Sequence, residues 1–252
     1  MKKIALVLCI AAAMFSCGLA RAMKKDFLSL QKEYPRVRKA FADKSGFIDK
    51  TLAAKKISAE NLNILIIAYK AEAELEVYAK NSDEDVYKSI AVYAIVSSSG
   101  KLGPKRRQGD MQVPEGFYSI DRFNPASSFY LSLGINYPNK SDKKKSSALN
   151  LGGDIFIHGS NVTIGCIPVT DDKIKEIYVL SAYAKNAGQS EIPVYIFPFK
   201  MSDANMEKYK ALYLKEPKLI SFWENLKTGY DKFTQTAREL KFSIDASGTY
   251  IF

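Results

Sequence analysis

Histidine and cysteine are scarce in this sequence of 252 residues, which contains one His and three Cys. Cys9 and Cys17 lie near the N-terminus, so Cys166 is the only thiol in the rest of the chain, and His158 is the only imidazole. One His and one Cys supply two of the four ligands that a zinc site needs, which argues against a metal centre. A lone thiol forms no internal disulfide, so Cys166 is either a buried, inert side chain or a reactive one.

The sequence also lacks an apolar run long enough for a permanent transmembrane helix. Residues 4–15 are apolar but too short; they follow two lysines and precede small residues, a pattern typical of a secretory signal peptide. An A-x-A site at 20–22 predicts a signal peptide over 1–22, with lipidation of Cys17 or an uncleaved anchor as alternatives. We therefore expect export to the periplasm, with membrane attachment only through the signal or a lipidated Cys17.

Acidic residues are outnumbered by basic ones, and the formal net charge is +10. The predicted signal carries three basic residues and no acidic one, so its removal leaves +7. Nucleic acid is the usual partner of a basic protein, but export argues against it. Wall peptides with free carboxylates and anionic envelope lipids are better candidates, and a surface that merely solubilises the protein is the alternative.

The hydrophobic fraction of 47% is enough for a core, and the pattern along the chain predicts a β-rich α+β domain with helices at both ends. We expect a signal peptide (1–22), an N-terminal helical segment (23–58), a catalytic domain (59–200) with a bent or sandwich-like mixed sheet, and a C-terminal helical extension (201–252). Strands are predicted at 62–69, 75–78, 91–96, 117–120, 129–133, 154–157, 194–199 and 250–252, and helices at 171–182, 206–214 and 219–240.

Several local expectations depend on breaker and turn residues. Pro35 predicts a break in the N-terminal helical segment, and Ser45-Gly46 predicts a turn before a second helix. Residues 97–116 are rich in Gly and Pro and read as loop, and residues 140–147 read as a polar, Lys-rich loop.

His158 ends a short buried strand, and Cys166 follows it by eight residues. A cysteine attacks a carbonyl as the thiolate, so it needs a nearby base. Gly159 and Gly165 permit the tight loop that would bring the thiol and the imidazole together, and the N–H groups of Gly165 and Cys166 are candidates for an oxyanion hole. A helix that starts soon after Cys166 and the carboxylate of Asp154 are further candidates for support of this pair.

The motifs His158-Gly159 and Thr163-x-Gly165-Cys166-Ile167 resemble the signature of the L,D-transpeptidase catalytic domain, the YkuD-type fold. Further segments resemble the YafK-like branch of that family over roughly residues 60–200: Gly100-x-Leu102-Gly103-Pro104-Lys105, Gly109-Asp110, Pro114-Glu115-Gly116-x-Tyr118, Asn124-Pro125 and Tyr137-Pro138-Asn139. Separate motifs in the right order make this resemblance specific.

The resemblance implies a peptidoglycan enzyme whose thiolate takes over the acyl group of a stem-peptide diaminopimelate and passes it to an amine or to water. It assigns Cys166 as nucleophile, His158 as general base and the Gly159 carbonyl as the group that orients the imidazole. Ser160, Thr163 and Gly165 are candidates for substrate contact. Lys105 and Asp110 in the loop rich in Gly and Pro are further candidates, and a role as turn and solvent residues is the alternative for both. Pro168 replaces an Arg found in many members, and the gap from His158 to Cys166 is short, which leaves the acceptor and leaving group open.

Two alternatives stay open. A hydrolase, either an L,D-carboxypeptidase of the kind that sets cell shape or an amidase that releases a wall-linked lipoprotein, would use the same acyl-enzyme with water. A wall-binding protein without catalysis would keep the fold but have no need for Cys166 and His158. The enzymatic hypothesis implies no cofactor, because acyl transfer to a thiolate requires none.

Overall fold

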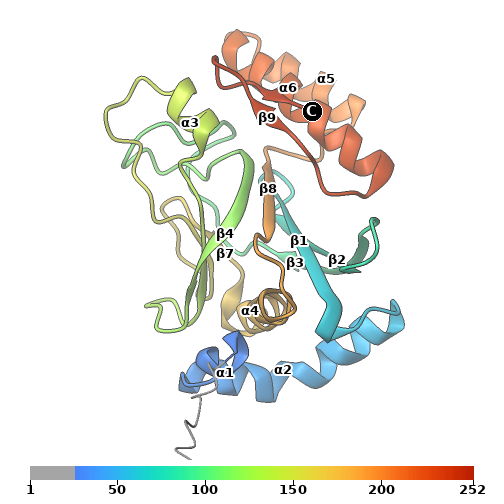
Figure 1. Cartoon of the computed structure of the whole chain (residues 1–252). Helices are drawn as coiled ribbons and strands as arrows, with labels where there is room; N and C mark the ends of the chain where they lie inside the picture. The colour runs from blue at the N-terminus through green and yellow to red at the C-terminus, as the bar shows by residue number, and fades with distance from the viewer. Residues whose placement is uncertain (1–25) are drawn as a thin grey trace, which may run out of the picture.

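An eight-stranded mixed sheet forms the centre of the computed structural model, which describes residues 26–252 (Figure 1). The predicted signal segment with Cys9 and Cys17 lies outside the described residues. The strands run in the order β3-β2-β1-β8-β4-β5-β6-β7, and the pairs β1–β8 and β6–β7 are parallel. Their bounds are β1 (Leu62–Tyr69), β2 (Glu74–Asn81), β3 (Lys88–Ala94), β4 (Gly116–Asn124), β5 (Ser132–Ile135), β6 (Phe156–His158), β7 (Ile167–Pro168) and β8 (Pro193–Phe197). This architecture confirms the predicted α+β class.

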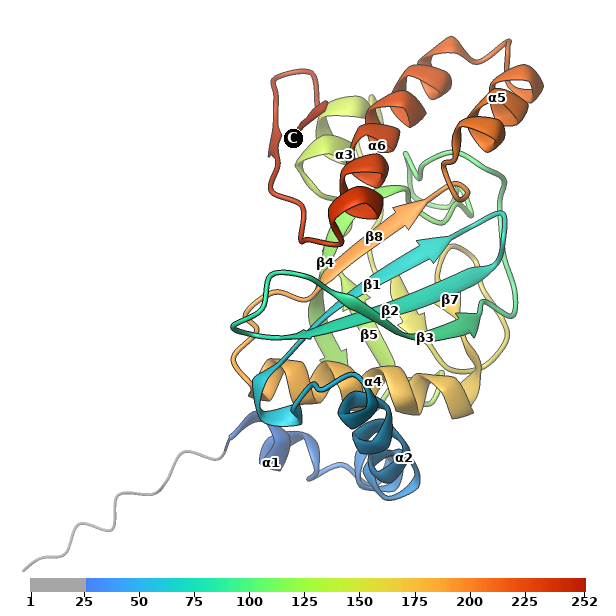
Figure 2. The same ribbon diagram turned by 90° about the vertical axis from the view of Figure 1, so that its right-hand side faces the viewer.

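Both faces of the sheet are covered, which explains the unbroken apolar run of β1. Ile64, Ile66 and their even-numbered neighbours join one core, and Leu65 and Ile67 join a second core on the opposite face, because successive side chains of a strand point to opposite sides. Figure 2 shows α4 (Thr170–Asn186) beneath the sheet and α5 (Asp203–Leu212) and α6 (Pro217–Thr236) above it. The prediction of a strand buried on both sides is confirmed.

Strand β4 joins two halves of the curled sheet. Its residues 116–119 pair with β8, whereas residues 120–124 pair with β5. The register shifts between Ile120 and Arg122, the kind of irregularity that bends a strand. The half formed by β5, β6 and β7 therefore turns away from β1–β3 and carries His158 at the end of β6.

The N-terminal helices α1 (Phe27–Gln31) and α2 (Pro35–Ala54) lie under α4 (Figure 2). Pro35 occupies the first turn of α2, where its missing N–H has no intrahelical partner, so the predicted break is confirmed. The predicted turn at Ser45-Gly46 is wrong, because α2 continues through it. Lys44 forms ion pairs of 2.7 and 2.9 Å with Asp172 and Glu176 of α4, and tertiary contacts of this kind offset the roughly 1 kcal/mol that Gly costs within a helix.

The Lys-rich segment predicted as a loop contains a helix, α3 (Lys140–Lys145). Its start is fixed by a capping box, in which the side chains of Asn139 and Asp142 each accept a hydrogen bond from the other's backbone N–H. The Ser141 hydroxyl donates to the Gly248 carbonyl, so the helix is also held by the chain's end. The prediction was based on the polar composition of the segment, whereas the helix is fixed by the local Asn-x-x-Asp cap and by the contact with Gly248, which is distant in sequence.

The C-terminal extension ends in a small hairpin formed by β9 (Ser243–Ile244) and β10 (Tyr250–Ile251), which confirms the predicted terminal strand. A short 3-10 turn, η1 (Ala59–Asn61), precedes β1. Within residues 26–252, none of the helices combines the length and apolar character needed to cross a bilayer. The domain boundaries at 58/59 and 200/201 stay a prediction.

Candidate active site

Cys166 lies at the edge of the sheet, one residue before β7. Because Ile157 of β6 is in register with Ile167 of β7, Cys166 lies beside Phe156. The Sγ atom accepts a hydrogen bond from the Phe156 N–H at 3.4 Å and lies 3.6 Å from the carbonyl oxygen of Asp154. The thiol is partly buried, and it lines a cavity of about 220 Å³ together with Lys70 and residues 97–102.

His158 closes β6 and is 1% exposed. Its Nδ1 lies 2.5 Å from the carbonyl oxygen of Gly159, the contact that the family resemblance implied. A carbonyl can only accept, so Nδ1 carries the proton and Nε2 is left as the basic nitrogen. The ring also packs on Phe129, with ring centroids 4.6 Å apart, and this contact fixes the plane of the imidazole.

The segment that carries Phe129 differs from the prediction of a strand over 129–133. Strand β5 begins at Ser132, and Tyr130 has a φ of 70°, a left-handed conformation that turns the chain before the strand. Phe129 is thereby freed from strand pairing and lies against His158. The apolar pattern could not reveal this role, because an aromatic residue fits a strand equally well.

Register places the thiol and the imidazole on one face of the β6–β7 pair. Phe156 and His158 point to the same side of β6, because side chains alternate along a strand, and Cys166 lies beside Phe156. Among the hydrogen bonds of residues 26–252, none joins Cys166 to His158; the thiol instead contacts backbone groups. Such catalytic contacts are often loose without substrate.

Close packing explains why position 159, the first of the loop between His158 and Cys166, is occupied by glycine. A Cβ on Gly159 would lie 2.5 Å from Oδ1 of Asp171 and 2.7 Å from the carbonyl oxygen of Phe129. The same Asp171 oxygen accepts the N–H of Ser160 at 2.7 Å, and Ser160 adopts a φ of 64°. Helix α4 therefore uses a carboxylate in its first turn to hold the loop.

Thr163 and Gly165 fix the other end of this loop. The Thr163 hydroxyl donates to the carbonyl of Cys166 at 2.8 Å and accepts the N–H of Gly165 at 3.1 Å. Gly165 has a φ of 136°, and a Cβ there would lie 3.0 Å from the backbone carbonyl of Gln112. The Gly165 N–H is thus already engaged, which leaves the N–H of Cys166 as the oxyanion-hole candidate of the predicted pair.

Electrostatics keep both reactive groups neutral near pH 7. Burial raises the pKa of the Cys166 thiol above its usual 9.0; the Phe156 N–H and the charge of Lys105 lower it, and the Asp154 carboxylate raises it further. Burial lowers the pKa of His158 below 6.5, against the opposing effect of its Gly159 contact. The site without substrate therefore holds a thiol and a neutral imidazole, not a thiolate and an imidazolium.

The remaining predicted polar residues support the loops. Lys105 and Asp110 form a largely buried ion pair of 2.6 Å, and Asp110 also accepts backbone N–H groups from its own loop. Substrate contact by Lys105 stays a prediction. The hypothesis that the Asp154 carboxylate supports His158 is wrong in geometry, because this carboxylate points to solvent and pairs with Arg122 at 2.8 Å.

A second buried ion pair beside the cysteine cavity escaped the sequence analysis. The Nζ of Lys70 bonds Glu115 at 2.8 Å and the carbonyls of Gly103 and Val113 at 2.8 and 3.0 Å. Glu115 is fully buried and also accepts the indole N–H of Trp223 at 2.9 Å. Lys70 directly follows the buried strand β1, and a lysine at the end of such a strand is a signal that could have been used.

Within residues 26–252, no group of three or more His, Cys, Asp and Glu side chains is arranged to hold a metal ion.

The family model of the L,D-transpeptidase catalytic domain (YkuD) matches residues 63–196. The "Putative L,D-transpeptidase YafK" of Escherichia coli (strain K12) is 38% identical over 190 residues, which cover 75% of this chain and 73% of that protein. The protein of the same description from Escherichia coli O157:H7 matches equally.

Two solved structures are similar at lower identity. The helical cell shape determining protein Pgp2 from Campylobacter jejuni is 18% identical with a TM-score of 0.43, over 73% of each chain. Bd1075 from Bdellovibrio bacteriovorus is 24% identical with a TM-score of 0.39, over 68% of this chain and 62% of that one.

Proposed function

This chain belongs to the L,D-transpeptidase catalytic domain family, and from that membership we propose that it is an exported cysteine enzyme acting on the peptide part of the bacterial cell wall. Family membership supports an enzyme that modifies peptidoglycan through its stem peptides. The finer assignment is an acyl-enzyme formed on Cys166 with the acyl group of a stem-peptide diaminopimelate.

One observation carries the assignment of Cys166 and His158. The Nδ1–H of His158 donates to the Gly159 carbonyl, so the unprotonated nitrogen is Nε2, and the cysteine lies on the same face one strand away. A buried neutral imidazole with a fixed tautomer is suited to act as a general base.

The reaction follows from these positions. When the substrate carbonyl enters the cavity beside Cys166, the thiol proton passes to Nε2 of His158, and Sγ attacks the carbonyl carbon. The carbonyl oxygen gains the negative charge, and the Cys166 N–H stabilises it. The intermediate collapses as the amine leaves with the proton from His158, and a thioester on Cys166 remains.

An amine or water then resolves the thioester. His158 takes a proton from the incoming nucleophile and returns it to Sγ as the thioester breaks. An amine yields a transpeptidation product, and water yields a shortened peptide or a released wall-linked protein.

The deciding experiment is a mass-spectrometric muropeptide profile of isolated sacculi incubated with the purified protein and, in parallel, with the Cys166→Ala variant. Shortened stem peptides or a released amine that appear only with the unmodified protein identify a hydrolase. New cross-links or exchanged D-amino acids that appear only with the unmodified protein identify a transpeptidase. Identical profiles contradict the enzymatic proposal and favour a wall-binding protein.

Export to the periplasm is a proposal that depends on residues 1–22. The lysines, the apolar run and the small residues of this segment support it. The intact mass of the protein recovered from cells distinguishes cleavage after Ala22 from lipidation of Cys17. A full-length mass in the cytoplasmic fraction alone contradicts export.

A further inference from the structure

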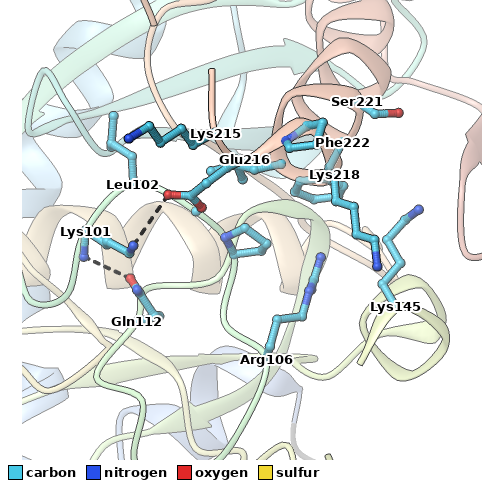
Figure 3. A pocket seen from close by; sticks show the side chains of 14 residues that line it. Lys101, Leu102, Arg106, Gln112, Lys145, Lys215, Glu216, Lys218, Ser221 and Phe222 are labelled. Carbon is cyan, nitrogen blue, oxygen red and sulfur yellow. Dashed lines mark hydrogen bonds and ion pairs between the residues drawn. The ribbon is translucent and has the colours of Figure 1, made fainter. Parts of the chain in front are cut away.

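A large basic cavity lies between the catalytic domain and the C-terminal extension. Its volume is about 920 Å³, within the range of roughly 300–1,000 Å³ that ligand pockets occupy. The loop from β3 to β4 supplies one wall through Lys101 and Arg106, α3 contributes Lys145, and residues 215–222 at the start of α6 supply the opposite wall (Figure 3).

The lining carries far more positive than negative charge. Five basic side chains face one acidic side chain, Glu216. Two of the cations have carboxylate partners: Arg106 pairs with Asp142 at 2.9 Å, and Lys101 lies 3.7 Å from Glu216. The other three, Lys145, Lys215 and Lys218, have no carboxylate within ion-pair distance among the described residues.

The three unpaired lysines are spread along the cavity instead of converging on one point. In Figure 3, Lys145 and Lys218 lie at the end near Arg106, and Lys215 lies toward the end where Lys101 meets Glu216. Burial and the charge of Arg106 lower the pKa of Lys145, against the smaller opposing effect of the Asp245 carboxylate, and the ammonium of Lys145 also donates to the Thr249 hydroxyl at 3.4 Å. An anion that enters this end would offset the repulsion between Lys145 and Arg106.

Apolar side chains form the rest of the lining, among them Leu102, Leu219 and Phe222. A phosphate site requires donors that converge, often with backbone N–H groups or a free guanidinium, whereas the guanidinium of Arg106 is held by Asp142. Ammonium groups that are separated by apolar side chains are instead complementary to a ligand chain in which carboxylates are spaced apart and linked by aliphatic atoms. A peptide with acidic side chains or free α-carboxylates has that form.

The basic cavity adjoins the cysteine cavity, because Lys101 and Leu102 line both. Residues 215–222 lie outside the segment 63–196 that matches the family model, so one wall comes from an extension of the catalytic domain. A peptide bound here can reach Cys166 along the loop from β3 to β4.

We propose that the basic cavity binds a carboxylate-bearing peptide segment of the substrate, at a distance from the bond that Cys166 attacks. The C-terminal extension thereby selects substrates that carry negatively charged groups beyond the residue whose bond Cys166 attacks. This inference rests on the proposed function for its assignment to a substrate, but the binding itself requires no catalysis.

The test uses the whole chain with Cys166→Ala, so that no turnover occurs. Fluorescence anisotropy measures binding of a labelled peptide of alternating glutamate and alanine, and of the same peptide with glutamine in place of glutamate. We expect the glutamate peptide to bind about tenfold more tightly or better at low salt, with the difference shrinking as salt rises. Equal binding of the two peptides overturns the proposal.

The site is tested by reversing its unpaired charges. The double variant Lys215→Glu with Lys218→Glu should weaken binding of the glutamate peptide by about tenfold or more. The control is Lys50→Glu with Lys208→Glu, which changes the net charge equally at exposed positions that do not line the cavity. It should change binding by less than about twofold. A glutamate at position 218 lies in the first turn of α6, where an acidic side chain favours the helix, so folding is retained.

Two further outcomes overturn the proposal. Equal losses in the two double variants mean that only the net charge of the protein matters. Displacement of the peptide by inorganic phosphate at concentrations where acetate has no effect identifies a phosphate site instead. Because Cys166 is absent throughout, failure of this inference is distinct from identical muropeptide profiles, which contradict the enzymatic function alone.

Discussion

The two loops that border Cys166 are held in different ways. The loop from β6 to β7, residues 159–166, is held by hydrogen bonds of the Thr163 hydroxyl, by the Asp171 carboxylate at the Ser160 N–H, and by tight backbone packing at Gly159 and Gly165. It leaves the side chains of Val162 and Ile164 exposed. The loop from β3 to β4, residues 95–115, is held by two buried ion pairs, Lys70–Glu115 and Lys105–Asp110.

This difference suits the separate roles of the two loops, one of which carries Cys166 while the other supports the cavity beside it. The loop with Cys166, the proposed nucleophile, contains no charged side chain, so the electrostatic field at the thiol comes from outside this loop, from Lys105 and Asp154. The other loop has little regular structure, and buried charges fix it because each ion must keep its partner. The proposed chemistry and the structural support thus lie in different loops. Substitutions in one loop should therefore affect mainly activity, and substitutions in the other should affect mainly stability.

Replacing the nucleophile should have the largest effect on activity and a small effect on folding. Cys166→Ala removes the group that forms the thioester, so turnover of sacculi should fall by about 10⁴-fold or more. The thiol makes only weak contacts, and the free energy of unfolding in urea should change by less than about 1 kcal/mol. A loss of several kcal/mol would mean that Cys166 is a core residue.

Breaking the buried ion pair between Lys70 and Glu115 should instead have a large effect on folding. Glu115→Ala leaves the ammonium of Lys70 buried without a carboxylate and should lower the free energy of unfolding by about 3–5 kcal/mol. Urea unfolding measures the loss. Lys70→Met combined with Glu115→Leu removes both charges and should recover most of it; if the double variant is as unstable as the single one, the charge pair is not the cause.

A methyl group at Gly159 should disturb the catalytic loop by overpacking. Gly159→Ala places a carbon against Asp171 and Phe129, so we expect a loss of about 1–3 kcal/mol and a fall in activity, because the Gly159 carbonyl orients His158. The matched control is Gly153→Ala, where no atom lies within 4 Å of the new carbon. Thermal unfolding and muropeptide turnover should distinguish them, and equal behaviour contradicts the packing argument.

Loss of the Thr163 hydroxyl should have a smaller effect. Thr163→Val removes the bonds to the Cys166 carbonyl and the Gly165 N–H and should cost about 1–2 kcal/mol, whereas Thr163→Ser retains the hydroxyl and should cost little. Hydrogen exchange of the Gly165 amide reports on the loop directly. Unchanged exchange in Thr163→Val would show that the loop is held elsewhere.

The smallest effect concerns pH. If neutral His158 is the base, kcat/KM rises with pH to a plateau through a pKa below 6.5, and direct ionisation of Cys166 enters only above 9.0. Below pH 6.5 the unfolded chain takes up the histidine proton before the folded one, so stability also falls as pH falls toward the folded pKa. Activity that still rises steeply between pH 7 and 8.5 would contradict this assignment.

Sequence patterns predicted much of the fold because they record burial. The apolar alternation from Leu62 predicted β1, and the scarcity of His and Cys indicated His158 and Cys166 as candidates for the site. The errors at Ser45-Gly46 and at residues 140–147 have the opposite origin. There, Lys44 contacts α4 and Ser141 contacts Gly248, both distant in sequence, so local propensity was overruled.

By itself, the sequence determined the class of fold and the family and singled out Cys166 and His158 as the candidate pair, because periodicity and motif spacing are local properties. Only the tertiary structure decided the burial that raises the pKa of the Cys166 thiol, the buried pair of Lys70 with Glu115 and the basic cavity. Each of these depends on groups brought together from distant segments, and the electrostatic energy of a group is set by its neighbours in space and not by its neighbours in the chain.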